Sequence, residues 1–121
     1  MRREVAETAR ILAERLSRSG ASIEEALRGV EVRLDREDAC EMLERLKPLV
    51  RAYAAIEEGS LQPSAAYLAL RPVVEVLERV CRGRPVDDTL VALALAVIGL
   101  LEAGKAARAS TIAAVIETRL R

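Results

Sequence analysis

The strongest constraint on the fold is a run of twelve residues, Leu90–Leu101, that contains no polar or charged side chain. A helix that spans a membrane needs about 20 such residues, so we expect the run to be buried inside the protein and predict no membrane span. Ala and Leu dominate its first half rather than β-branched residues, which favours a helix over a strand. Because the run is apolar on every side, it predicts a central helix, over about residues 88–103, that other helices surround.

Apolar residues at helical spacing recur along the rest of the chain and predict the surrounding helices. The segments cover about residues 3–19, 22–31, 35–59, 64–82 and 110–120, with a loop over residues 104–109. Ser22 and Glu25 have the spacing of a capping box at the start of the second segment. We therefore predict an all-α protein, with residues 1–121 forming a single domain: one compact bundle of five or six helices.

The third segment is the longest, and Asp35 is its candidate N-cap. Pro48 lies inside the third segment, where it removes a helical hydrogen bond, so we expect that helix to kink or divide there. The fourth segment also carries a proline, Pro72, near its middle. We expect Gly59 to end the third helix and residues 59–63 to form a turn. The inward-facing residues predicted for the third helix are Ala39, Met42, Leu43, Leu46, Leu49, Val50, Tyr53 and Ile56.

The composition excludes most helical-bundle chemistry. The chain has no His, so by itself it cannot build a Ser-His-Asp site, a di-iron bundle or a His-ligated zinc site. Nineteen basic and nineteen acidic residues cancel to a formal charge of zero, so no overall charge points to nucleic acid or an anionic membrane. We predict no catalytic residues, no metal and no cofactor.

Cys40 and Cys81 are too few to close a zinc site, and they do not form a Cys-x-x-Cys pair. Two buried free thiols are the favoured interpretation, and a disulfide is the alternative. The near absence of Asn, Gln and Met, together with dense Arg and Glu, indicates a thermophile, and hyperthermophiles keep disulfides inside the cell. The charged amino terminus does not resemble a secretory signal, so we expect a cytoplasmic protein.

Carboxylates are paired at helical spacing at three places, Glu4/Glu7, Glu41/Glu44 and Glu75/Glu78. The pairs resemble the Glu-x-x-Glu motifs with which some all-helical nucleotide pyrophosphohydrolases hold magnesium, which implies a magnesium-dependent nucleotide hydrolase as an alternative. The favoured interpretation is an ion-paired surface, because the last two pairs each have an Arg at i+1 or i+4.

Basic residues gather near the end of the fourth segment and in the predicted loop after the fifth. The candidate nucleic-acid or anion-binding residues are Arg71, Arg79, Arg82, Arg84, Lys105 and Arg108. Residues 96–120 also have the order of a helix-turn-helix opening, but the chain ends before a third helix could enter a groove. The competing interpretation for the residues near the end of the fourth helix is that they complement its dipole.

Small residues line one side of the central helix, at Ala92, Ala96, Gly99 and Ala103. Such a line lets the backbone of a neighbouring helix approach closely, so these residues are a candidate interaction face. With no catalytic group in view, we predict a non-enzymatic interaction or assembly module that binds a protein partner or forms a homo-oligomer. The alternative is a DNA- or RNA-associated helical protein that uses the basic residues.

Overall fold

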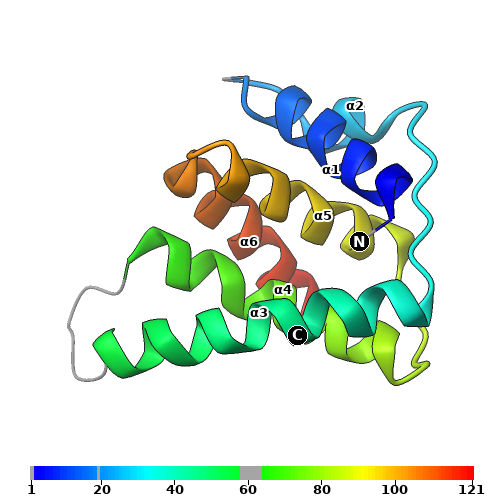
Figure 1. The fold of residues 1–121 in the computed structure, drawn as a ribbon. Coiled ribbons are helices and arrows are strands. Elements are labelled where there is room, and N and C mark those ends of the chain that lie inside the picture. The colour runs from blue at the N-terminus through cyan, green and yellow to red at the C-terminus, as the bar shows by residue number, and fades with distance from the viewer. Residues whose placement is uncertain (1, 19, 58–63) are drawn as a thin grey trace.

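The chain is all-α in a computed structural model that describes residues 2–18, 20–57 and 64–121 (Figure 1). In these residues it forms six helices and no strand. The helices are α1 (Arg3–Leu16), α2 (Ile23–Leu27), α3 (Arg36–Glu57), α4 (Ala65–Cys81), α5 (Asp88–Glu102) and α6 (Ala106–Leu120). The predicted helical class and compact bundle are confirmed. None of the described helices is long and apolar enough to cross a membrane.

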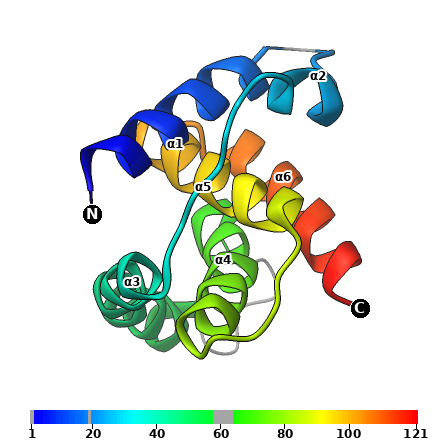
Figure 2. The same ribbon diagram turned by 90° about the vertical axis from the view of Figure 1, so that its right-hand side faces the viewer.

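Helix α5 is the centre of the core, as predicted. Every residue from Leu90 to Leu100 is buried, and Leu93, Leu95 and Val97 are completely so. Helix α1 covers one side of α5, while α4 and α6 cover the other (Figure 2). An apolar helix of this kind is stable because neighbours remove all of its faces from water.

The helix ends follow the capping chemistry of the sequence. Ser22 accepts a hydrogen bond from the Glu25 amide, and Asp35 accepts one from the Asp38 amide. Helices α4 and α5 both finish in a glycine with positive φ, 75° at Gly83 and 77° at Gly104. The next residue in each case donates back across the turn, Arg84 to Arg79 and Lys105 to Leu100, which is the Schellman arrangement.

Predictions about helix limits are wrong at two places. The second helix, predicted over about residues 22–31, is only Ile23–Leu27. The predicted loop over residues 104–109 is much shorter, because Gly104 completes the turn after α5 and α6 then begins at Ala106 rather than at Ser110. The Ser110 hydroxyl donates to the Ala107 carbonyl inside the helix instead of capping it. Of the two outcomes expected at Pro48, division does not occur, since α3 continues through the proline, and α4 likewise continues through Pro72. The predicted turn over residues 59–63 lies outside the described residues.

Candidate functional site

Helix α3 differs sharply between its two halves. Its buried residues are Asp38, Ala39, Met42 and Leu43, all in the first turns. None of residues 44–57, which we call the distal half of α3, is buried. This half nevertheless carries large apolar side chains, and Leu49 and Ile56 are 50% and 79% exposed. The prediction that these two residues face inward is therefore wrong.

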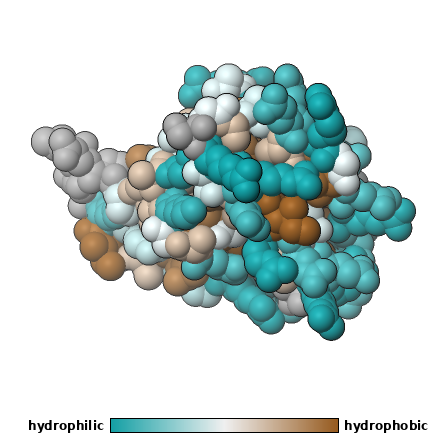
Figure 3. Space-filling model, turned by 90° about the horizontal axis from the view of Figure 1, so that it is seen from above, coloured by the Kyte–Doolittle hydropathy of each residue, from teal (hydrophilic) through white to brown (hydrophobic). Residues whose placement is uncertain are grey.

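The exposure follows from the position of α3 at the edge of the bundle. Among the described residues, α4 is the one helix with which α3 makes an extensive contact. The two helices form a hairpin whose far end extends beyond α5 and α6 (Figure 1). Hydrophobic surface is visible at that end of the molecule (left in Figure 3). A helix with one neighbour buries one row of apolar side chains, and the second row on α3 stays in water.

Leu49, Ala52 and Ile56 form this second row, which we call the outer row of α3. They lie at steps of three and four residues and all three are exposed. Arg45 continues the same line toward the start of the helix and is bonded to Glu41 at 3.0 Å. The outer row is thus an apolar strip with the Arg45–Glu41 ion pair at one end.

The other end of the hairpin is closed by a disulfide between Cys40 of α3 and Cys81 of α4, with the two Cα atoms 4.9 Å apart. The favoured prediction of two free thiols is therefore wrong and the disulfide alternative is correct. The antiparallel packing of α3 on α4 brings the two residues together across a separation of 41 residues in the sequence. Both cysteines are half-buried.

Arg36 lies at the same closed end and was not singled out from the sequence. Its Nε donates to the Cys81 carbonyl oxygen at 3.2 Å, and the Cys40 Sγ lies 3.6 Å from that same oxygen. The guanidinium also packs on Gly83, where an added Cβ would stand 3.4 Å from the Arg36 Cζ. Arg36 and Cys81 are 45 residues apart, so no local pattern could have linked them.

The closed end is further tied to the start of the chain. Asp38 is buried, and its Oδ2 accepts a hydrogen bond from the Arg2 Nε at 2.7 Å. The Arg2 Nη2 also lies 3.4 Å from the Asp35 Oδ2. The hydrogen bond and the charge of Asp38 raise the pKa of Arg2 above its usual value. This ion pair satisfies a carboxylate that burial would otherwise penalise.

The six predicted anion-binding residues do not form one patch. Arg79 is paired with Glu75 at 3.2 Å, and Arg71 lies over the ring of Tyr67 with its Cζ 5.8 Å from the ring centroid. Arg82 and Arg84 are exposed and, within the described part of the chain, form no ion pair. They flank Gly83, so Arg36 joins them at the closed end of the hairpin.

Lys105 and Arg108 lie at the opposite end of α5 from Arg84. A helix of 15 residues is about 22 Å long, and Arg84 precedes α5 while Lys105 follows it. The Arg108 Nε donates to the Leu16 carbonyl oxygen at 2.7 Å, which ties α6 to the end of α1. Of the residues predicted for nucleic-acid contact, Arg82 and Arg84 therefore lie before one end of α5 and Lys105 and Arg108 after the other.

The predicted interaction face on α5 is largely filled by α1 of the same chain. Ala92, Ala96 and Gly99 are buried, while Ala103 is exposed. At Gly99 the backbone of α1 comes so close that an added Cβ would meet the Ala9 carbonyl oxygen. The small residues do admit a neighbouring helix, but that helix is α1.

The acidic pairs are partly engaged with arginine. Besides the Arg45–Glu41 and Arg79–Glu75 pairs, Arg3 lies 3.9 Å from Glu7. In the residues that the structure describes, no group of three or more Cys, Asp or Glu side chains is placed to hold a metal ion. The ion-paired interpretation is confirmed for Glu7, Glu41 and Glu75.

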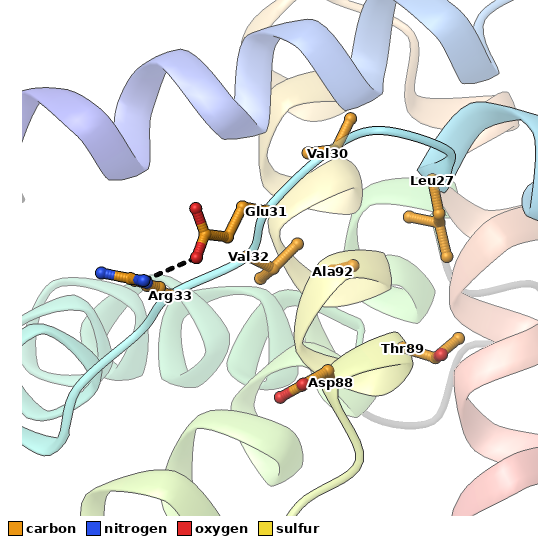
Figure 4. A pocket seen from close by; sticks show the side chains of 8 residues that line it. All are labelled: Leu27, Val30, Glu31, Val32, Arg33, Asp88, Thr89 and Ala92. Carbon is orange, nitrogen blue, oxygen red and sulfur yellow. Dashed lines mark ion pairs between the residues drawn. The ribbon is translucent and has the colours of Figure 1, made fainter.

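A cavity of about 550 Å³ lies between the connector that follows α2 and the first turns of α5 (Figure 4). Leu27, Val30, Val32 and Ala92 supply its apolar lining. The polar groups are Asp88, Thr89 and an ion pair between Glu31 and Arg33 at 2.6 Å. The lining has no nucleophile paired with a base, which leaves the hairpin as the stronger candidate site.

Comparison with known proteins gives no match to a protein-family model, a curated protein or a solved structure.

Proposed function

We propose that this chain is a non-enzymatic assembly module that associates with a second copy of itself through the outer row of α3. The observation that carries the proposal is the exposure of Leu49 and Ile56 on a helix half with no buried residue. Large apolar side chains that share an exposed row are typical of interaction surfaces. Their removal from water on association supplies the driving force.

The chemistry of the outer row supports a second copy as the partner. An antiparallel second copy, related by a two-fold axis near Ala52, lays Leu49 of each chain against Ile56 of the other. The small side chain of Ala52 at the centre allows the two helices to approach. The formal charge of zero means that two copies do not repel one another.

The test is a concentration series in analytical ultracentrifugation. The wild-type protein is expected to dimerise, and Ile56→Glu is expected to abolish the dimer because it places a carboxylate in the interface. Ile11→Glu is the matched control, since Ile11 is also an exposed apolar residue, at 38%, but lies on α1. A wild-type protein that stays monomeric at millimolar concentration, or equal loss of the dimer in both variants, would overturn the proposal.

The register has its own test. A chain that carries both Leu49→Lys and Ile56→Glu places each Lys against a Glu of the other copy in the antiparallel arrangement. This double variant is expected to dimerise again, with an affinity that falls as salt is added. Continued dissociation of the double variant would contradict the antiparallel register.

The alternative function is contact with nucleic acid at the closed end of the hairpin. It is favoured by the exposed arginines Arg82 and Arg84 beside Arg36. None of these three guanidinium groups has an ion pair with a described residue, so they are able to neutralise phosphates, and such binding weakens steeply with salt.

We also infer that the module acts in the cytoplasm of a thermophile. The scarcity of Asn, Gln and Met and the abundance of Arg and Glu support this, and hyperthermophiles retain intracellular disulfides of the Cys40–Cys81 kind. The midpoint of thermal unfolding of the oxidised protein is expected well above the range of about 45–65 °C that is usual for mesophile domains.

A further inference from the structure

We propose that Cys40–Cys81 is a thiol-exchange site, at which a small dithiol reduces the disulfide in the folded protein, and that Arg36 sets its reactivity. The inference goes beyond the proposed association and does not depend on it. It rests on three features of the disulfide's surroundings: the exposure of the two cysteines to solvent, the charge of Arg36 beside them, and the packing of α3 against α4.

Access comes from the edge position of the hairpin. Both cysteines are half-buried, unlike the neighbouring core residues Ala39 and Leu77, which are fully buried. Disulfides that remain accessible in the folded state exchange with external thiols, whereas fully enclosed ones need the protein to open first. The position at the end of α4 therefore gives a dithiol a side from which to attack.

The charge beside the disulfide favours exchange. The Arg36 Nε and the Cys40 Sγ approach the same oxygen atom, the carbonyl of Cys81, at 3.2 Å and 3.6 Å. A guanidinium at this place stabilises the thiolate that leaves when the sulfur–sulfur bond breaks. The exposed carboxylates within a turn of Cys40 are Glu37, Glu41 and Glu44, and solvent screens their opposing charge. Asp38 is buried but paired with Arg2, which leaves the half-buried Glu78, one turn before Cys81, as the main opposing charge.

The structure around the disulfide tolerates its opening. Helix α3 makes its extensive contact with α4, and the α5 core is closed by α1, α4 and α6. The buried residues Ala39, Met42 and Leu43 still hold the first turns of α3 after the bond is cut. Reduction therefore loosens the hairpin without exposing the residues that surround α5.

The dithiol supplies the two electrons and two protons that reduction of the disulfide requires. One thiolate of the dithiol attacks a sulfur of the Cys40–Cys81 bond, and the electron pair of that bond passes to the other sulfur, which leaves as a thiolate. The second thiolate of the dithiol then attacks the mixed disulfide and releases the remaining cysteine. The dithiol is oxidised to a cyclic disulfide, the protein disulfide is reduced by two electrons, and the two protons of the dithiol pass to the cysteines.

The experiment is the kinetics of reduction of the oxidised protein by dithiothreitol under native conditions, followed by alkylation of free thiols and mass spectrometry. The wild-type rate is expected to rise in proportion to the dithiothreitol concentration, because the reagent attacks the folded protein. A rate that is independent of the reagent concentration would mean that unfolding precedes attack, and it would overturn the proposal.

Three variants test the role of Arg36. Arg36→Gln is expected to slow reduction by about threefold for each unit by which the pKa of the leaving thiol rises. Arg36→Lys keeps the charge and is expected to keep most of the rate. Arg33→Gln is the control, because Arg33 is an exposed arginine that pairs with Glu31 on the connector. A wild-type rate in Arg36→Gln, or equal slowing in Arg33→Gln, would contradict the role of Arg36, provided that circular dichroism shows all variants folded.

Discussion

Gly99 of α5 and Ala9 of α1 mark a point of close backbone approach between the two helices. A Cβ placed on Gly99 would stand 2.5 Å from the Ala9 carbonyl oxygen and 2.8 Å from the Ala13 Cβ. The obstacle is the backbone of α1, which cannot move aside as a flexible side chain would. The crossing of the two helices therefore depends on the absence of a side chain at Gly99.

We expect Gly99→Ala to destabilise the protein by about 1–3 kcal/mol, the usual cost of overpacking a core. Helix propensity alone acts in the opposite direction, because alanine is favoured over glycine by about 1 kcal/mol in a helix. The sign of the change in the free energy of unfolding, measured with urea, therefore shows whether overpacking outweighs helix propensity. A stabilised Gly99→Ala protein would mean that α1 and α5 do not meet at this residue.

The free energy of unfolding is expected to fall when the disulfide is removed by the double substitution Cys40→Ala and Cys81→Ala. Closing a loop of 41 residues restricts the unfolded chain, and loop-closure entropy puts the effect at about 4 kcal/mol as an upper limit. Urea unfolding of the oxidised wild type and the double variant measures the difference. Equal midpoints would show that the bond contributes nothing to stability.

Arg2→Gln is expected to lower the midpoint of urea unfolding, whereas Arg3→Gln is expected to leave it unchanged. Arg2 is bonded to the buried carboxylate of Asp38, which the substitution would leave without its charged partner. The side chain of Arg3 is 92% exposed, and its ion pair with Glu7 is screened by water. The two neighbouring arginines thus form a matched pair, and equal effects would argue against the contact between Arg2 and α3.

Hydrogen exchange is expected to divide the molecule into a slow core and a fast edge. Amides of residues 90–100 lie in the buried helix and should exchange only through global unfolding. Amides of residues 44–57 lie in a helix half without buried residues and should exchange through local opening, faster by orders of magnitude. Similar protection of both segments, measured by mass spectrometry on dilute protein, would contradict this division.

Fluorescence anisotropy with labelled duplex DNA, single-stranded DNA and RNA separates the two proposed functions. We expect no binding at about 50 mM salt, since the predicted basic residues are divided between two ends of α5 and Arg79 is already paired. Binding that falls steeply by about 200 mM salt would support the nucleic-acid alternative instead. Arg82→Gln with Arg84→Gln would then be the variant to examine.

The central helix could be predicted from the sequence because burial on all sides leaves a local pattern. Leu90–Leu101 has no polar face, and only a helix that others surround tolerates this. Ser22 and Asp35 could be assigned as caps for a similar reason, since each cap and its partner amide are three residues apart. Features that depend on residues within a few helical turns of one another could thus be predicted from the sequence.

Of the candidate site, the sequence indicated the Cys40–Cys81 disulfide only as an alternative to two free thiols, because the parts of the site are distant in the chain. Cys40 and Cys81, or Arg36 and Cys81, are brought together only by the packing of α3 on α4. The prediction that Ile56 faces inward was wrong for a different reason. An apolar residue at helical spacing has the same pattern whether it faces the core or the solvent, so the sequence marks the row but not what covers it.

The Cys40–Cys81 bond also changes the topology of the chain. In the oxidised protein, the backbone of residues 40–81 and the disulfide together form a covalently closed ring, from which two tails extend. One tail carries α1 and the other carries α5, and these two helices pack against each other beside the ring. A single backbone cut anywhere inside the ring would leave one covalent molecule, so a nick between α3 and α4 becomes a separation into two chains only when the disulfide is reduced.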